Sequence, residues 1–223
     1  MVPDAFEFDA VILAGGRSSR LGGVPKQSLV YDGGTLLQRS LDAAAGAQSV
    51  VVVGPDPGPL PAGVITCRED PPFAGPAAAI GAGLTALAGT AGPRPPFTLL
   101  LACDMPNVGQ AVDALRQSLR PGDGAVAVSA DGRRQPLAGI YNTPALQRSV
   151  QDLNSRGTLM NASVSALLAR LDVQLVTVPA GSTDDVDTWD DATALGVAGQ
   201  EPGPVSGPAW PQLIWEADSE KPG

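Results

Sequence analysis

A glycine-rich stretch that carries three cations follows the first apolar segment of the chain. Residues 11–27 read VILAGGRSSRLGGVPKQ and contain four glycines together with Arg17, Arg20 and Lys26. Glycines placed after a strand let backbone N–H groups approach phosphate oxygens closely. Only two of the 14 basic residues are lysines, Lys26 and Lys221, so a compact point charge is indicated at Lys26. The stretch predicts a cradle for an anionic ligand, and a solvated surface lysine is the alternative.

The spacing of these glycines differs from two familiar phosphate-binding loops. A Walker loop has four residues between its glycines and ends in Gly-Lys-Ser/Thr, whereas five residues separate Gly16 from Gly22 and Pro25 precedes Lys26. The dinucleotide-binding pattern has one residue between its first two glycines, whereas Gly15 and Gly16 are adjacent. A phosphate site in this stretch is therefore of another type.

Two aspartates stand where either chemistry or capping would use a carboxylate. Asp104 directly follows the apolar run FTLLLAC, and proteins often hold Mg²⁺ with one or two carboxylates together with substrate phosphates. Capping of the helix expected near Asn107 explains Asp104 equally well. Asp70 precedes a Pro-Pro turn and a helix entry whose small residues, 75–83, would let a flat ring lie close to the backbone. Asp70 could instead only cap the turn, and a tight helix–sheet contact would explain the small residues.

Short apolar runs alternate with helical patterns along most of the chain. Strands are expected at 9–15, 49–55, 63–70, 97–106 and 173–180, and as a pair joined at Asp131-Gly132 within 124–142. Helices are expected at 35–47, 75–89, 107–120, 143–153, 159–171 and 188–196. This alternation predicts an α/β fold of three layers, Rossmann-like, with a mainly parallel twisted sheet and helices on both faces. Ligands bind such sheets beyond the carboxyl ends of the strands, where the glycine-rich stretch and Asp104 both lie.

Composition excludes several classes of protein. The chain has 223 residues, a net charge of −9 and no cluster basic enough for nucleic acid. It contains no histidine and only two distant cysteines, Cys67 and Cys103, which excludes zinc sites built on His and Cys and nucleophiles activated by His. No apolar run reaches membrane length, and the N-terminus lacks the pattern of a secretory signal. These features predict a soluble, cytoplasmic protein that binds neither nucleic acid nor a membrane.

The end of the chain differs in composition from the rest. Residues 197–223 hold nine Gly or Pro residues and a charge of −3. Such composition is typical of chains that cannot bury enough apolar surface to fold. We therefore expect one folded domain over residues 1–196 and a disordered, Pro/Gly-rich acidic tail over 197–223.

Five segments of the chain together resemble the molybdenum cofactor guanylyltransferase family, which belongs to the nucleotidyltransferases with a Leu-Ala-Gly/Ala-Gly-x-Ser-x-Arg-x-Gly…Lys loop. They read LAGGRSSRLGGVPK, EDPPFAGPAAAIGAGL, LLLACDMP, QPLAGIY and DVDTWDDA, and they span about residues 8–196 in the family's order. The first loop is specific for the superfamily, whereas LAGG and CDMP favour its guanine-transferring members. The resemblance implies a nucleotide-diphospho-sugar-transferase-like fold. It also implies that GMP passes from GTP to the phosphate of molybdopterin with Mg²⁺, which releases pyrophosphate and forms a guanine dinucleotide cofactor.

The resemblance further implies roles for individual residues. Those that would bind the nucleotide are Leu13, Ala14, Gly15, Gly16, Lys26, Asp70 and Asp104. Those that would act in catalysis are Arg20, Lys26 and Asp104, with Asp104 also the ligand of Mg²⁺, and those near the pterin are Gln135, Pro136 and Leu137. GTP, molybdopterin and a protein that delivers the pterin are the implied partners.

Two positions depart from the family's pattern. The late motif, Asn-x-Asn-Thr-Pro-Glu-Asp in the family, begins here at Asp185 and has Trp189 in place of proline, and Pro25 stands where an acidic residue is frequent. The aspartates of this motif could still serve near a metal. Transfer of CMP or another nucleotide to a different phosphate acceptor stays open as an alternative, and so does a nucleotide-binding module without catalysis.

Overall fold

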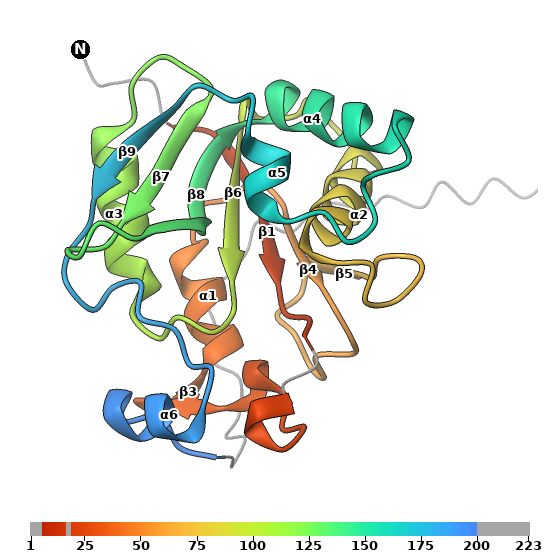
Figure 1. The fold of residues 1–223 in the computed structure, drawn as a ribbon. Helices are drawn as coiled ribbons and strands as arrows, with labels where there is room; N and C mark the ends of the chain where they lie inside the picture. Colours follow the sequence, from red (N-terminus) through yellow and green to blue (C-terminus); the bar gives the residue numbers. More distant parts are fainter. Residues whose placement is uncertain (1–5, 17–18, 200–223) are drawn as a thin grey trace, which may run out of the picture.

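Seven strands form one twisted sheet through the centre of the molecule (Figure 1). The computed structural model describes residues 6–16 and 19–199, and both Arg17 and the predicted tail beyond residue 199 lie outside them. The strand order is β5 (Val64–Cys67), β4 (Val50–Val53), β1 (Phe8–Leu13), β6 (Phe97–Ala102), β8 (Arg134–Asn142), β7 (Gly124–Val128) and β9 (Val173–Thr177). Neighbouring strands are parallel except at β8, which runs antiparallel to β6 and β7. The expected mainly parallel sheet is confirmed.

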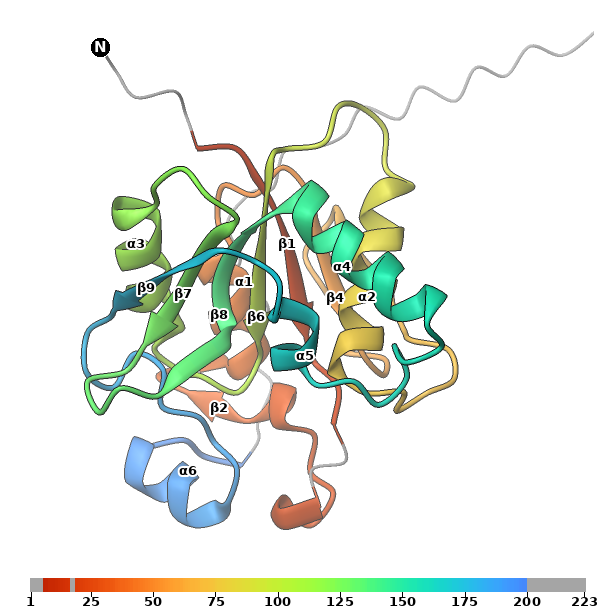
Figure 2. The same cartoon turned by 45° about the horizontal axis from the view of Figure 1, so that its top comes forward.

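Helices cover both faces of this sheet (Figures 1 and 2). One face carries α1 (Leu36–Ala43) and α3 (Val108–Ser118), and the other carries α2 (Pro76–Ala88), α4 (Thr143–Ser155) and α5 (Val164–Leu168). Successive residues of a strand point to opposite faces. In β1, Ile12 accordingly packs with the first pair of helices and Val11 with the second group. The chain therefore has the three-layer α/β architecture that its alternating patterns predict.

A small additional body of chain lies beyond the carboxyl ends of the parallel strands, and we call residues 19–35 and 185–198 the rim. It holds two 3₁₀ helices, Ser19–Leu21 and Lys26–Ser28, the short hairpin of β2 (Val30–Tyr31) and β3 (Gly34–Thr35), and α6 (Trp189–Leu195). Its two segments meet through a separate cluster of buried side chains from Leu21, Leu29, Val186, Ala192 and Val197, which Leu36 of α1 joins. Backbone hydrogen bonds of 2.9 and 2.8 Å between Val30 and Ala198 join the segments as well. The rim thus brings together residues that are far apart in the sequence.

One expected helix is much shorter than its sequence pattern. The pattern predicts a helix over 159–171, but α5 begins only at Val164 and ends at Leu168. Asn161 takes a left-handed backbone conformation with φ 61°, and the Ser163 side chain then accepts a hydrogen bond from Ala166 N as the N-cap of α5. The apolar spacing of this segment reflects burial against the face of the sheet that α2 and α4 also cover, rather than a continuous helix.

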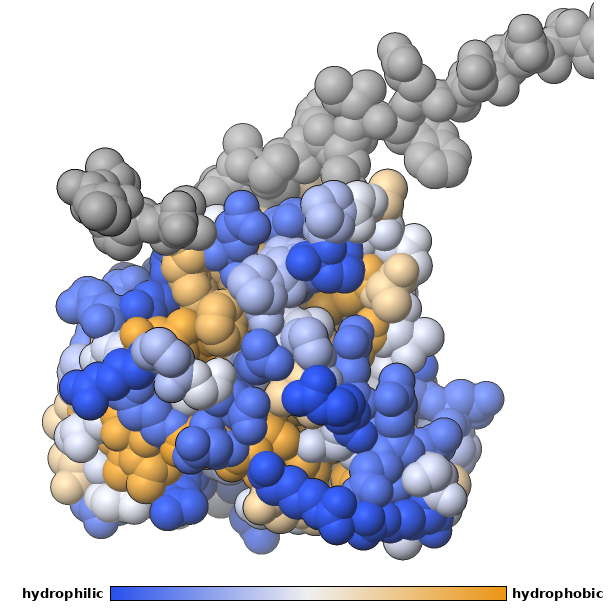
Figure 3. Space-filling model, turned by 90° about the horizontal axis from the view of Figure 1, so that it is seen from above, coloured by the Kyte–Doolittle hydropathy of each residue, from blue (hydrophilic) through white to orange (hydrophobic). Residues whose placement is uncertain are grey.

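Figure 3 shows the part of the face opposite the rim that the residues drawn in grey leave visible. Figure 3 looks down on the amino ends of the parallel strands, and there the hydrophobic residues form separate areas among hydrophilic ones. Over the part of the chain that the structure describes, no helix combines the length and the apolar character that crossing a bilayer requires.

Candidate active site

The carboxyl ends of β1 and β6 lie side by side and open onto one pocket. Leu13 pairs with Ala102 in the register of the two strands, so the glycine-rich loop and the segment that carries Asp104 leave the sheet together. Ala14 N donates to Val53 O at 2.8 Å, which ties the start of the loop to β4. The pocket measures about 510 Å³. Its lining residues come from both strand ends and from the rim: Leu13, Ala14, Gly15, Gly16, Arg20, Lys26, Gln27, Val53, Glu69, Phe73, Gly75, Pro76, Ala79, Ala102, Cys103, Asp104, Leu137 and Asp187.

A glycine that sequence reasoning did not single out allows the loop to start in this place. A Cβ atom at Gly54 would lie 2.8 Å from the carbonyl carbon of Ala14 and 2.9 Å from its oxygen. Both are backbone atoms, so any side chain there would push the loop away from β4. The sequence feature that could have identified it is its position: Gly54 directly follows the buried valine run, just as the glycine-rich loop directly follows β1.

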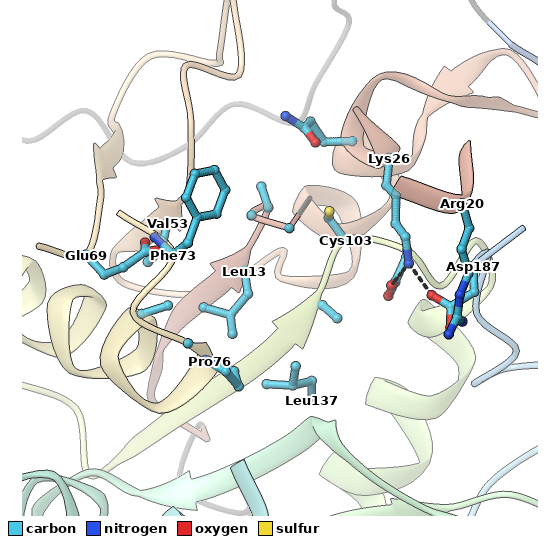
Figure 4. A pocket seen from close by; sticks show the side chains of 18 residues that line it. Leu13, Arg20, Lys26, Val53, Glu69, Phe73, Pro76, Cys103, Leu137 and Asp187 are labelled. Atoms are coloured by element: carbon cyan, nitrogen blue, oxygen red, sulfur yellow. Dashed lines mark hydrogen bonds and ion pairs between the residues drawn. The ribbon is translucent and has the colours of Figure 1, made fainter. Parts of the chain in front are cut away.

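Lys26 lies between two carboxylates at one end of the pocket (Figure 4). Its Nζ donates to Asp104 Oδ2 at 2.9 Å and also to Asp187 Oδ1, and its side chain is 19% exposed. Burial alone would lower the pKa of Lys26, but the charges and hydrogen bonds of Asp104 and Asp187 outweigh it and the pKa lies above its ordinary value. Lys26 is therefore a charged ammonium at neutral pH, held within the pocket rather than solvated at the surface.

Three carboxylates gather beside this lysine. Oxygen atoms of Asp104, Asp185 and Asp187 lie within 4.8 Å of one another. Burial raises the pKa of Asp185, and the charges of Asp104 and Asp187 raise it further. Arg133, whose Nη2 lies 3.4 Å from Asp185 Oδ1, acts in the opposite direction. Carboxylate oxygens grouped in this way are the ligands that Mg²⁺ and other hard divalent cations prefer. The residues present therefore fit a divalent cation.

The rim sets the position of Asp187. Val186 N donates to Asp104 O at 2.9 Å, and the buried Val186 side chain belongs to the rim cluster. Directly after Asp187, a capping box between Thr188 and Asp191 starts α6, and Asp191 also accepts from Asp187 N at 3.2 Å. Helix α6 thus begins at Trp189, where the family that the sequence resembles has a proline, because Thr188 and Asp191 supply the cap.

Asp104 faces Lys26 and takes no part in capping α3. Asn107 occupies the N-cap position of that helix, and neither residue makes a side-chain capping hydrogen bond. The Asn107 side chain instead accepts a hydrogen bond from the Tyr31 hydroxyl at 3.1 Å, a contact between α3 and the rim. Arg20 completes the charged end, with Nη1 3.7 Å from Asp187 Oδ2 and a side chain that is 72% exposed.

The other end of the pocket is largely apolar. Figure 4 shows Val53, Phe73 and Pro76 at this end, with Leu13 between them and the charged residues. Glu69 is the polar residue there, and its Oε1 accepts a hydrogen bond from Phe73 N at 2.9 Å. The pocket therefore joins a region suited to a flat, apolar group with a region suited to phosphate and metal.

Most of the predicted site residues line this pocket, and three do not. Those that line it are Leu13, Ala14, Gly15, Gly16, Arg20, Lys26 and Asp104. Asp70 is exposed and absent from the lining that the structure describes, whereas its neighbour Glu69 belongs to it. Gln135 donates from Nε2 to Thr183 O at 3.2 Å, and Pro136 O accepts from the Tyr141 hydroxyl at 2.6 Å. Of the QPL segment, only Leu137 reaches the lining.

Residues 10–179 match the model of a family described as the MobA-like NTP transferase domain. The chain is 36% identical over 150 residues to a probable molybdenum cofactor guanylyltransferase of Mycobacterium ulcerans, covering 65% of this chain and 73% of that one. It is 34% identical over 172 residues to a protein of the same description from Mycobacterium tuberculosis, covering 74% and 83%.

Two solved structures with low sequence identity share the fold. Molybdopterin-guanine dinucleotide biosynthesis protein A from Archaeoglobus fulgidus superimposes with a TM-score of 0.61 at 19% identity, over 84% of this chain and 96% of that one. 2-C-methyl-D-erythritol 4-phosphate cytidylyltransferase from Thermus thermophilus gives a TM-score of 0.58 at 21% identity, over 85% and 98%. The nucleotide-diphospho-sugar-transferase-like fold expected from the sequence is confirmed.

Proposed function

The chain belongs to the family of MobA-like NTP transferases, and on that basis we propose that it transfers GMP from GTP to the phosphate of molybdopterin. The family makes the chain a nucleotidyltransferase, and the guanine base, the pterin acceptor and Mg²⁺ are the proposed part. The descriptions of the mycobacterial relatives support guanine and the molybdenum cofactor.

One observation carries the proposal. Lys26 donates hydrogen bonds to Asp104 and Asp187 in the pocket at the carboxyl ends of β1 and β6, directly beside the glycine-rich loop. Phosphate transfer between two anions needs cations that offset their repulsion, and it needs precise positioning. An ammonium with a raised pKa, next to oxygen ligands for a divalent cation, meets the first need. The sheet edge, with its loop held against β4, meets the second.

In the proposed reaction, an oxygen of the pterin phosphate forms a bond to the α-phosphorus of GTP. The bond from that phosphorus to the oxygen bridging it to the β-phosphate breaks, and pyrophosphate leaves. Lys26 and Arg20 neutralise negative charge on the triphosphate as it accumulates on the leaving group. Gly15 and Gly16 allow their backbone N–H groups to approach the phosphates closely.

The carboxylates of Asp104, Asp185 and Asp187 would hold Mg²⁺, which when bound neutralises and orients phosphate oxygens. The nucleophile in this reaction is already an anion, so the enzyme needs no general base to create it. The absence of histidine from the whole chain agrees with this requirement.

We also propose that the reaction takes place in the cytoplasm, since GTP is its donor, and that another protein delivers the pterin. Both stay predictions from the family resemblance.

The test is release of pyrophosphate from GTP in the presence of Mg²⁺, with and without molybdopterin, and with CTP in parallel reactions. We expect release from GTP that depends on the pterin, together with a product that contains both GMP and the pterin by mass spectrometry. The Lys26→Ala variant serves as the control for contaminating activity.

Three other outcomes would change the assignment. Release from CTP alone would keep the transfer mechanism and overturn the guanine assignment. Release from GTP with another phosphate acceptor, but not with molybdopterin, would overturn the acceptor. Tight binding of GTP without release in either reaction would contradict the proposed transfer to molybdopterin.

A further inference from the structure

Phe73 adopts a backbone conformation that is unfavourable for its side chain. Its φ is 66°, in the left-handed region that glycine tolerates and bulky residues rarely enter. Of the other non-glycine residues described with positive φ, Asp32 and Asn161 belong to the types most often found there. Strain of this kind costs free energy and persists where the surroundings impose it, often at binding sites. The outlier therefore raises the question of what this ring does.

The ring stands at the apolar end of the pocket, away from the charged residues (Figure 4). It is 49% exposed although it is large and hydrophobic. The guanidinium of Arg68 lies over the ring, 5.1 Å from its centroid, and Glu69 accepts a hydrogen bond from the Phe73 backbone N–H. These two contacts help to hold the ring on the lining of the pocket.

A flat ring and a carboxylate side by side suit one kind of group, a purine with hydrogen-bond donors on its edge. Aromatic side chains stack on any nucleobase, because every base has a π face. The carboxylate of Glu69 is an acceptor only, and its two oxygens offer about four lone-pair sites, one of which Phe73 N–H uses. Guanine presents two adjacent donors, N1–H and the 2-amino group, whereas cytosine presents one donor beside the acceptor N3.

We propose that Phe73 stacks on the guanine of the bound nucleotide and that Glu69 accepts hydrogen bonds from its N1–H and 2-amino group. This inference rests on the proposed function and adds the residues that would select the base. It gives the carboxylate contact to Glu69, whereas its neighbour Asp70, which the family resemblance implies binds the nucleotide, is exposed and absent from the described lining. The base then lies at the apolar end of the pocket, and the phosphates lie toward Lys26.

The experiment measures dissociation constants of GTP, ITP, CTP and inorganic tripolyphosphate with Mg²⁺ by calorimetry. The proteins compared are the full-length wild type, Phe73→Ala, Phe73→Gly, Glu69→Gln and Met160→Ala. Met160 is 54% exposed, also hydrophobic, and absent from the described lining, so Met160→Ala is the matched control. Glycine adopts the φ of residue 73 without strain, so Phe73→Gly should keep or raise the Tm.

Both Phe73 variants should bind GTP about 5- to 150-fold more weakly, the range expected for loss of one base–aromatic stack. Tripolyphosphate affinity should stay unchanged, because the ring does not contact the phosphates in this arrangement. ITP lacks the 2-amino group, so the wild type should prefer GTP to ITP, and Glu69→Gln should reduce that preference. The Met160→Ala protein should bind every ligand as the wild type does.

The possible failures can be told apart. If the folded Phe73 variants bind GTP as tightly as the wild type, or lose GTP and tripolyphosphate equally, the stacking role is overturned while the proposed function stands. An unchanged preference for GTP over ITP in Glu69→Gln overturns the role of Glu69. If the wild type binds no nucleotide more tightly than it binds tripolyphosphate, this inference and the proposed function are overturned together.

Discussion

At the scale of single residues, the charged end of the pocket depends on one ammonium group shared by two carboxylates. The Lys26 and Asp104 side chains are 19% and 20% exposed, and Asp187 is more open at 46%. Such half-buried charges interact more strongly than surface pairs, since water screens them less. Arg20, with a side chain that is 72% exposed, contributes less to this balance.

Replacing Lys26 by alanine should lower kcat by about 100-fold or more, because a cation that stabilises transition-state charge is worth that much at comparable sites. The measurement is steady-state pyrophosphate release, with circular dichroism to show that the variant is folded. Replacing Lys26 by arginine should restore the charge but only part of the activity, because the planar guanidinium lacks the geometry of an ammonium. A fully active Lys26→Ala enzyme would remove the lysine from the mechanism.

Residues at strand ends could be predicted from the sequence, and residues placed by loops could not. The glycine-rich loop and Asp104 follow apolar strands whose carboxyl ends must share one edge, and that loop leads on to Lys26. Asp187 is 161 residues from Lys26, and only packing of the rim brings the two together. Glu69 and Asp70 are adjacent carboxylates in one loop, so composition alone could not decide which of them lines the pocket. The strain at Phe73 leaves no signal in the pattern of residue types.

At the scale of elements, α2 lies unusually close to the sheet that carries the glycine-rich loop. A Cβ atom at Gly83 would lie 2.6 Å from Val11 Cγ1 of β1 and 3.1 Å from Val53 Cγ2 of β4. Both valines are buried and stiff at χ1, so neither can move aside easily. The small residues of α2, which sequence reasoning left open as a flat-ring platform or a tight contact, include a tight contact at Gly83.

Gly83→Ala should therefore destabilise the protein by about 1–3 kcal/mol, the usual cost of overpacking a core. Gly109→Ala is the matched control, since Gly109 also lies in a helix, α3, and a Cβ there would meet no atom within 4 Å. Alanine favours helix there, so this control should keep or raise stability by up to about 1 kcal/mol. Urea unfolding of both variants tests the pair, and equal stability of the two would contradict the tight contact.

Very short strands and the ends of one helix could not be predicted from the sequence. Strands β2 and β3 contain two residues each, too few for any alternation to be recognised. The pattern over 159–171 has helical spacing, yet Asn161 in a left-handed conformation and the Ser163 cap confine the helix to α5. Longer elements such as β1 and α2 match their predictions closely, because their apolar sequences are long enough to be recognised.

At the scale of the whole molecule, one buried ion pair joins the core to a surface loop. Asp9 of β1 is fully buried, accepts from Ser49 N at 3.0 Å and lies 3.4 Å from Arg94 Nη1. Burial raises the pKa of Asp9 above the ordinary value of 3.8, although Arg94 and the Ser49 hydrogen bond act in the opposite direction. The folded protein therefore holds a proton on Asp9 more tightly than the unfolded chain does.

This raised pKa gives a pH dependence with a definite sign. As the pH rises from 3.8 through the folded-state pKa, the unfolded chain loses the Asp9 proton first, so this group's contribution to stability falls. Asp9→Asn removes the titration while keeping the shape. The free energy of unfolding of Asp9→Asn, relative to the wild type, should therefore increase between about pH 4 and pH 7 in urea titrations. A difference that stays constant or decreases over this range would contradict the buried, raised pKa.

The rim has a core of its own, separate from the two clusters that hold the sheet between its helices. Leu29→Ala should weaken this small core by about 2–5 kcal/mol, the usual cost of truncating a buried leucine. We expect the temperature of half-inactivation to fall further than the Tm followed by circular dichroism. Leu115→Ala, at a fully buried position of the main core, should lower both temperatures in step. Equal shifts of the two temperatures in Leu29→Ala would contradict an independent rim.

Lys26, Asp185 and Asp187 all belong to the rim, whereas Asp104 stays with the sheet. Regions with few buried contacts open locally before the protein unfolds as a whole. Warming should therefore first separate the charged groups from the strand ends while the sheet remains folded. Loss of activity in that temperature range should be reversible on cooling, without the aggregation that follows exposure of the main core.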